Sequence, residues 1–285
     1  RIYADKDAKW MIEKESNKPY LPETDTFDTW FSSGQWATIV FSSQNSIDFS
    51  YFYPSDSIII GHDLLRLSVA RKILLSFYIS KRLPFRLVYL HALLLGTDGQ
   101  KMSKSIGNTV TLEHYLENFG ADVTRMALVS CSSSQEDFYF SEKRLEFFQD
   151  FSRRLWHLGQ AVALANDYNL EPLNNLQFSQ EDRKLISEVD HIAKKTDSFI
   201  VKYMLASAQE EVCSFLSILE DYTKSAPNKK IQSIMMALKE AYKRYLSILH
   251  PFMPFMTEKL YDNLYDKSSL LADAHYPVQN SLTKK

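Results

Sequence analysis

The chain of 285 residues is poor in glycine and cysteine and has no long apolar run. Its 7 glycines fall well below the average of about 7% in proteins, which favours helices over loop-rich β structure. Two cysteines, Cys131 and Cys213, are too few for a disulfide scaffold or a four-thiolate zinc site, and they favour a reducing cytoplasm. No run approaches the roughly 20 apolar residues of a membrane-spanning helix, and no basic and apolar leader precedes a small-residue cleavage site. We therefore expect a cytoplasmic protein without a membrane segment.

The charges nearly cancel, with 33 lysines and arginines against 35 aspartates and glutamates. A net charge of −2 provides no overall basic field for a nucleic acid, so any such contact has to come from local basic patches. The hydrophobic fraction of 45% is that of an ordinary globular chain, and the length suffices for one large domain or two medium ones.

Residues 57–90 carry the pattern of a strand, a helix and a second strand. Residues 57–60 are a short apolar run rich in β-branched side chains, as in a buried parallel strand, and Gly61 closes it. Apolar residues from 63 to about 80 recur with helical spacing, and residues 86–90 form a second short run. This order and spacing predict a βαβ crossover, the unit from which nucleotide-binding sheets are built.

From residue 121 onward the sequence predicts helices almost throughout, with four or five helices of bundle length after residue 142. The expected fold is therefore predominantly helical, with an α/β segment followed by an all-α helical bundle. We expect the border between them near residue 140.

Between these two parts, residues 99–108 form a polar loop punctuated by glycines. Lys101 and Lys104 stand three residues apart beside the hydroxyls of Ser103 and Ser105. Ammonium, hydroxyl and inward-turned backbone N–H groups together can hold a phosphate chain. A solvated surface loop is the alternative interpretation, since runs of charged and polar residues usually form exposed faces.

The order Lys-Met-Ser-Lys-Ser at 101–105 resembles the signature loop of the class I aminoacyl-tRNA synthetases. Upstream, Asp-Thr-Trp-Phe-Ser-Ser at 28–33 resembles the segment by which the valine, isoleucine and leucine enzymes re-enter the catalytic sheet after their inserted editing domain. The resemblance covers nearly the whole chain and is closest to the valine enzymes. Its further collinear blocks, the last of them typical of the anticodon-binding bundle, are residues 61–63, 69–71, 88–91, 119–125, 143–156 and 249–255.

The resemblance implies that the loop binds the phosphates of ATP. Lys101 and Lys104 would contact the triphosphate and stabilise charge while an amino-acid carboxylate attacks the α-phosphate and pyrophosphate leaves. Met102 and Ser103 of the same loop would belong to the ATP site.

Three more residues of the ATP site follow from the resemblance. Gly61 would allow close approach of the nucleoside, Asp63 would accept hydrogen bonds from the ribose hydroxyls, and His91 would lie near the adenine. The carboxyl end of a parallel strand is where doubly wound sheets bind nucleotides. As alternatives, Asp63 could serve as a helix N-cap or first-turn acid, and His91 could be a structural histidine.

The resemblance also places Trp30 and Ser68 at the amino-acid pocket. A flat apolar wall such as Trp30 suits a branched aliphatic side chain, whereas the alternative is a plain core tryptophan. Ser68 departs from the valine enzymes, which usually have a tryptophan there that closes the pocket. A serine leaves a gap or a polar wall, so isoleucine, leucine and methionine stay open as alternative substrates.

A second departure is the lack of the His-x-Gly-His motif that these enzymes carry in the first half of their nucleotide fold. We interpret the chain as a C-terminal section of such an enzyme, inactive by itself. Residues 1–22 would be the tail of the editing insertion, 23–140 the second half of the Rossmann-like catalytic domain, and 141–285 the helical anticodon-binding domain. A non-catalytic module that binds tRNA or a protein partner is the alternative.

The complete enzyme implied by the resemblance is an aminoacyl-tRNA ligase. Its partners would be tRNA, an aliphatic amino acid and ATP, with Mg²⁺ accompanying ATP as the substrate complex. We expect no metal bound by protein ligands and a monomeric protein.

Overall fold

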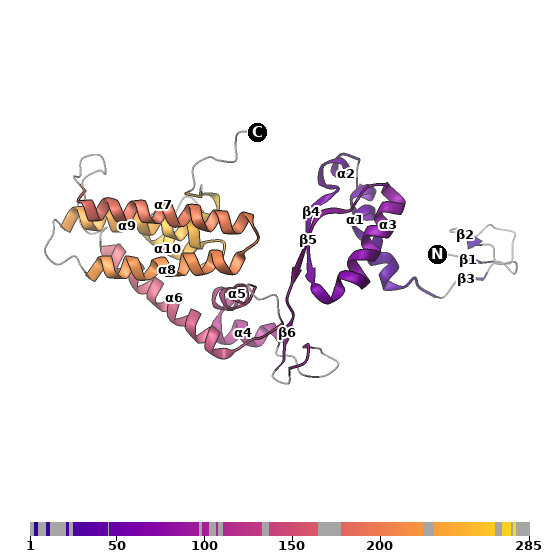
Figure 1. Cartoon of the computed structure of the whole chain (residues 1–285), viewed down its shortest axis with the longest axis horizontal. Helices are drawn as coiled ribbons and strands as arrows, with labels where there is room; N and C mark the ends of the chain where they lie inside the picture. The colour runs from indigo at the N-terminus through magenta and orange to yellow at the C-terminus, as the bar shows by residue number, and fades with distance from the viewer. Residues whose placement is uncertain are drawn as a thin grey trace. The chain divides into compact units, whose positions relative to one another are not determined.

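The computed structural model divides the chain into two compact units, Arg1–His91 and Ala92–Lys285 (Figure 1). Each unit is described by itself. Near the N-terminus, the backbone forms an antiparallel sheet of three two-residue strands in the order β2-β1-β3, namely β1 (Tyr3–Ala4), β2 (Trp10–Met11) and β3 (Leu21–Pro22). The structure describes residues 3–4, 10–11, 21–22, 25–44, 46–96, 99–102, 107, 111–132, 137–164, 178–224, 231–265, 270–274 and 276–277.

The first unit contains the predicted βαβ crossover. Strand β4 (Ser55–Gly61) pairs in parallel with β5 (Phe85–His91), in a register that runs from Ser55 opposite Phe85 to Gly61 opposite His91. Helix α3 (Ala70–Ser80) lies between the two strands in the chain. Two helices precede them, α1 (Thr29–Gln44) and α2 (Ser46–Phe52). The strand–helix–strand prediction is confirmed.

The segment that leads into α3 differs from the single regular helix predicted from residue 63. A 3₁₀ turn, η1 (His62–Leu64), is followed by a π-helical turn, η2 (Leu65–Val69), before α3 begins. In a π-helical turn the hydrogen bonds reach five residues back, so the faces are rotated relative to those of an α-helix. Ser68 and Val69 are consequently buried, while Leu65 and Leu67 are exposed.

Helix α1 packs on α3, and Gly34 of α1 lies at this contact. A Cβ atom on Gly34 would lie 2.5 Å from Cδ1 of Leu75. At the same place the buried Ser76 hydroxyl donates a hydrogen bond of 3.3 Å to the Gly34 carbonyl. The Leu75 side chain therefore lies against Gly34, and a larger residue at position 34 would require this methyl group to move.

The second unit is almost entirely helical, in agreement with the predicted fold class (Figure 1). Two short parallel strands, β6 (Leu94–Leu95) and β7 (Phe138–Tyr139), are its only strands among the described residues. Figure 1 shows α7, α8 and α9 running alongside one another, and both α8 and α9 pack on α7. The helices of the unit are α4 (Leu112–Phe119), α5 (Ala121–Ser130), α6 (Glu142–Ala163), α7 (Gln180–Val201), α8 (Leu205–Lys224), α9 (Ile231–Leu249) and α10 (Pro254–Leu264), followed by the 3₁₀ turn η5 (Leu271–Asp273).

One continuous hydrophobic core joins α5 to the helices that follow it. Two fully buried tyrosines of α9 lie within this core and differ in hydrogen bonding. The Tyr242 hydroxyl donates to the Leu155 carbonyl of α6 at 2.8 Å. The Tyr245 ring packs against Phe215 at a centroid distance of 5.4 Å, and among the described residues its hydroxyl has no hydrogen-bond partner.

These two tyrosines give a matched test of the core. We expect Tyr242→Phe to lower the free energy of unfolding by about 1 kcal/mol, because a buried hydrogen bond is lost. Tyr245→Phe should leave it unchanged or raise it, because the substitution removes a buried polar group without a partner. Urea unfolding of both variants measures the difference. Equal losses in the two variants would contradict this account.

Helix α7 begins with a reciprocal pair of hydrogen bonds. The Ser179 side chain accepts from the Asp182 N–H at 3.2 Å, and the Asp182 carboxylate accepts from the Ser179 N–H at 2.8 Å. The Tyr222 hydroxyl of α8 donates to the same carboxylate at 2.6 Å. Burial raises the pKa of Asp182, but hydrogen bonds from Tyr222, Ser179 and Ser233 outweigh it, so the pKa is lower than the ordinary value.

The pH dependence of stability tests this carboxylate. Because the pKa of Asp182 is lower in the folded than in the unfolded chain, its ionised form stabilises the fold above about pH 4. That contribution is lost as the pH falls through the pKa of the folded state. We expect Asp182→Asn to lower stability at pH 7 and to reduce the loss between about pH 5 and pH 2 relative to the parent chain. Chemical unfolding across this range measures it; parallel curves for the two proteins would refute it.

Helix α10 begins against a carboxylate from α5. The buried Asp122 accepts from the backbone N–H of Phe255 at 3.3 Å and of Met256 at 2.6 Å. Three residues along α5, Arg125 donates to the Pro251 carbonyl at 3.0 Å. Burial raises the pKa of Asp122 above its ordinary value, although the two N–H donors oppose the shift.

Candidate active site

The carboxyl ends of β4 and β5 bring together two of the residues expected to bind ATP. Gly61 and His91 are direct partners in the last pair of the parallel register. Gly61 is buried, whereas His91 is exposed. Asp63 follows two residues after Gly61, is exposed, and lies in the first turn of η1. The three residues therefore share one end of the two-stranded sheet, the end at which parallel sheets bind nucleotides.

Trp30 lies in the first turn of α1 and is stacked by a cation. The Asp28 carboxylate accepts from the Trp30 backbone N–H at 2.6 Å, an arrangement typical of an N-cap residue. The Arg71 guanidinium of α3 lies 4.6 Å from the centroid of the Trp30 ring. The indole is 37% exposed, so it is not a plain core tryptophan within the first unit. One face of the ring is used by Arg71 through a cation–π contact.

Ser68 is buried and its hydroxyl accepts a hydrogen bond from the Lys72 ammonium at 2.9 Å. The serine hydroxyl thus has a cation beside it. Leu67 and Phe77, the nearby apolar side chains of the same segment, are 51% and 50% exposed. Consecutive cations of α3, Arg71 and Lys72, therefore contact the two residues expected at the amino-acid pocket, one each.

In the second unit, the segment before the lysine-rich loop turns back on itself. The Gly96 N–H donates to the Gln100 carbonyl at 2.8 Å, and the Gly99 N–H donates to the Gly96 carbonyl at 3.0 Å. Gly99 has a φ of +77°, and a Cβ atom there would lie 2.9 Å from the Tyr139 hydroxyl, so this turn requires glycine.

The turn presents the first residues of the loop. Lys101 is exposed, and its backbone forms an isolated antiparallel β-bridge with Leu95. Met102 is half-buried and donates its N–H to the Leu94 carbonyl at 3.3 Å. The expected phosphate-binding residues Ser103 and Lys104 lie outside the described residues. The structure therefore positions Lys101 and Met102 and leaves the roles of all four residues as predictions.

Two features bear on the expected cofactors and on membranes. Among the described residues, no group of three or more histidines, cysteines, aspartates or glutamates is placed to hold a metal ion. Within the same ranges, every helix is too short or too polar to cross a membrane.

Sequence reasoning did not find the roles of Arg71, Lys72 and Asp137. Arg71 and Asp137 act on partners that neither helical spacing nor a motif singles out. Lys72 was detectable in principle, since it follows Ser68 by four residues and such pairs are neighbours on a helix. Arg71 contacts a residue 41 positions earlier, and Asp137 accepts from the Leu93 N–H at 2.8 Å across 44 positions.

Residues 1–141 match the family described as tRNA synthetases class I (I, L, M and V), and residues 182–285 match the anticodon-binding domain of tRNA ligase. A valine--tRNA ligase of Clostridium tetani is 28% identical over 277 residues, which cover 93% of this chain and 31% of the relative. That of Carboxydothermus hydrogenoformans is 30% identical over 269 residues, covering 90% of this chain and 30% of the relative. The chain thus spans about a third of the length of these relatives.

Solved structures agree on the fold. The LeuRS of Agrobacterium radiobacter K84, in a ternary complex with tRNA and LeuAMS, matches with a TM-score of 0.83 at 16% identity, covering 98% of this chain and 40% of the other. The methionyl-tRNA synthetase of Mycobacterium tuberculosis, in complex with methionyl-adenylate, matches with a TM-score of 0.65 at 20% identity, over 78% of this chain and 46% of the other. Both family matches lie in the expected order along one chain, and together with the fold they show that this chain belongs to the class I aminoacyl-tRNA synthetases.

Proposed function

We propose that this chain is the part of a valine--tRNA ligase that provides the second half of the catalytic domain and the anticodon-binding bundle. The observation that carries the proposal is the pair of family matches together with valine--tRNA ligases that align over at least nine-tenths of the chain. On this proposal, residues 1–22 end the editing insertion, 23–140 complete the catalytic domain, and 141–285 form the anticodon-binding domain. The complete protein would act in the cytoplasm as a monomer.

In the proposed reaction, the carboxylate oxygen of the amino acid forms a bond to the α-phosphorus of ATP while the bond to the bridging oxygen breaks and pyrophosphate leaves. Gly61 and His91 would receive the nucleoside at the ends of β4 and β5, and Asp63 would accept from the ribose hydroxyls. Their shared position at one end of the parallel pair supports these roles. A hydroxyl of the terminal ribose of tRNA would then attack the carbonyl carbon of the aminoacyl-adenylate, forming an ester while the bond to the phosphate breaks and AMP leaves.

The phosphates would be held by the loop. Lys101 and Lys104 would stabilise the charge that moves onto pyrophosphate, with Met102 and Ser103 beside them, because catalysis of such a transfer depends mainly on positioning and charge stabilisation. Mg²⁺ would arrive with ATP as part of the substrate. No step in this account is assigned to a metal held by protein ligands.

The amino-acid pocket would have Trp30 as its apolar wall and Ser68 as its departure from the valine enzymes. The contact of Lys72 with the Ser68 hydroxyl supports a polar wall at this point. Valine remains the proposed substrate because the Trp30 segment and the relatives both point to it. Isoleucine, leucine and methionine are the alternatives that a substrate panel separates.

Lys104→Ala tests the phosphate role of the loop in the complete protein that carries this sequence. We expect the rate of valine-dependent exchange of pyrophosphate into ATP to fall by about 10²–10³-fold, with little change in the KM for valine. The reason is that an ammonium facing the phosphates matters most when charge moves in the transition state. Lys143→Ala, an exposed lysine on α6, serves as the control. An unchanged kcat in Lys104→Ala would contradict a phosphate role and favour the alternative that the loop is a solvated surface segment.

Ser68→Trp tests the pocket in the same protein. We expect the parent to prefer valine, and we expect the indole to lower kcat/KM for leucine and methionine relative to valine by about tenfold or more, because it removes space worth more than one methylene. Lys72→Met removes the ammonium group that contacts Ser68 but keeps the serine, so it separates the effect of the charge from the effect of the side-chain volume at position 68. A parent that prefers methionine or leucine over valine would refute the valine assignment while leaving the class I assignment intact.

A further inference from the structure

The backbone of Trp30 is fixed more firmly than its ring. The Asp28 carboxylate accepts from the Trp30 N–H at 2.6 Å, and the Asp28 carbonyl accepts from the Phe31 N–H at 2.9 Å. These bonds hold the start of α1 but do not restrict the two side-chain torsions of the indole. Because the indole is 37% exposed, packing within the first unit does not enclose it. The orientation of the ring therefore depends on side chains that contact its faces.

The Arg71 guanidinium makes such a contact. Its Cζ atom lies 4.6 Å from the centroid of the Trp30 ring, within the roughly 6 Å over which a cation is attracted to an aromatic face. The other cation–ring distances among the described residues are longer, from 5.1 to 6.0 Å. A guanidinium suits this position because it is planar and only weakly hydrated. Arg71 thus covers one face of the Trp30 indole.

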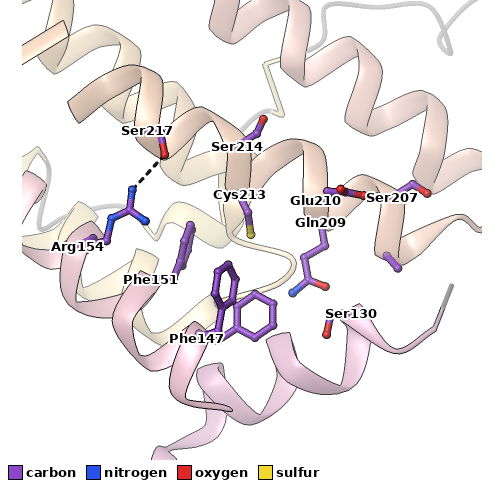
Figure 2. A pocket seen from close by; sticks show the side chains of 12 residues that line it. Ser130, Phe147, Phe151, Arg154, Ser207, Gln209, Glu210, Cys213, Ser214 and Ser217 are labelled. Atoms are coloured by element: carbon purple, nitrogen blue, oxygen red, sulfur yellow. Dashed lines mark hydrogen bonds between the residues drawn. The ribbon is translucent and has the colours of Figure 1, made fainter. Parts of the chain in front are cut away.

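No carboxylate competes with the ring for this cation. Within the described part of the chain, Arg71 forms no ion pair. Arg154 shows the other situation, at a pocket between α5, α6 and α8 (Figure 2). It donates to the Glu220 carboxylate at 2.9 and 2.6 Å and to the Ser217 hydroxyl at 3.1 Å (Figure 2). The charge of Arg154 binds a carboxylate, whereas that of Arg71 is directed at an aromatic ring.

Arg71 is carried by a helix and not by a loop. It is the second residue of α3, which packs on α1, the helix whose first turn contains Trp30. Further along α3, the Leu75 side chain lies against Gly34, and the Ser76 hydroxyl donates to the Gly34 carbonyl at 3.3 Å. Since the two helices are joined at this second place, the guanidinium reaches the ring from a fixed backbone. A contact between two regular elements orients a side chain more precisely than a contact from a loop.

We propose that Arg71 is a positioning residue for the amino-acid pocket. It holds the Trp30 indole in the orientation in which the ring forms the apolar wall, and it acts through the ring. The inference rests on the proposed function, which assigns that wall to Trp30. An indole without this contact populates other orientations, and the apparent affinity then falls with the fraction of molecules in the competent one. Such a loss weakens substrate and transition state equally, so it changes the KM and not the kcat.

Kinetics of the complete protein test this split. We expect Arg71→Gln to raise the KM for valine in pyrophosphate exchange about three- to tenfold, with kcat within about twofold of the parent. Arg71→Lys keeps a cation but loses the planar group, so its KM should lie between the two. Arg86→Gln, an exposed arginine at the opposite end of β5 from His91, is the matched control and should leave both constants unchanged. An unchanged KM in Arg71→Gln, or a loss in kcat alone, overturns the proposal.

A Trp30→Leu background shows whether Arg71 acts through the ring. There Arg71→Gln should change the KM by less than about twofold, because the indole that it orients is absent. An equal rise in both backgrounds would mean that Arg71 acts by another route, and it overturns the proposal. If Trp30→Leu raises the KM but Arg71→Gln does not, only the present inference fails. If Trp30→Leu leaves the KM unchanged, the role of Trp30 in the proposed function fails, and this inference fails with it.

Fluorine NMR measures the orientation of the ring without any need for amino-acid activation. The 285-residue chain labelled with 5-fluorotryptophan contains four labelled rings, those of Trp10, Trp30, Trp36 and Trp156, and Trp30→Leu identifies the resonance of Trp30. Arg71→Gln should shift this resonance and leave that of Trp156 in α6 unchanged. Thermal unfolding verifies that each variant is folded. A Trp30 resonance that does not respond to Arg71→Gln overturns the proposal, whether or not the parent shows valine-dependent exchange.

Discussion

The arrangement of the second unit depends on one buried carboxylate, that of Asp122. Helix α10 begins at Pro254 after Met253, whose side chain cannot cap a helix. The two N–H groups left open at this end, those of Phe255 and Met256, donate to Asp122. Burying the carboxylate is unfavourable, as its raised pKa shows, and the two N–H donors offset that cost. The start of α10 is thus capped by a residue of α5, more than 130 positions away.

This cap helps to explain why α5 packs with the helical bundle, although the sequence of α5 matches the catalytic family. Asp122 lies in the part of the chain that matches the class I catalytic family, and α10 lies in the part that matches the anticodon-binding domain. The hydrogen bond from Arg125 to Pro251 reinforces the same junction, and Gln209 of α8 donates to the Met126 carbonyl of the same helix. Helix α5 is therefore held by residues of both α8 and the segment that begins α10.

The sequence predicted what local patterns determine. Strands β4 and β5 and helix α3 follow from the spacing of apolar residues, and the helical second unit follows from long periodic segments with few glycines. The π-helical turn at Leu65–Val69 could not be predicted in the same way, because its geometry depends on what the turn packs against. The border expected near residue 140 concerns domain type, whereas the compact units divide between His91 and Ala92 according to which residues lie close together. That border stays a prediction.

The candidate site was predictable where a motif names a residue and its strand end positions it, as for Gly61 and His91. It was not predictable where two side chains meet across the fold. The contact of Arg71 with Trp30 depends on the packing of α1 on α3, where the Leu75 side chain lies against Gly34. No pattern along the sequence encodes that distance.

Ser68 shows how such packing changes what a single residue is expected to do. Where the resemblance leads one to expect a tryptophan, a serine read alone indicates lost volume. The π-helical turn buries this serine, and Lys72 then places an ammonium 2.9 Å from its hydroxyl. A cation held there needs an acceptor because it is partly removed from water, and the serine provides one. Ser68 and Lys72 are therefore best understood as one polar pair, in which the hydroxyl fixes where the neighbouring charge lies.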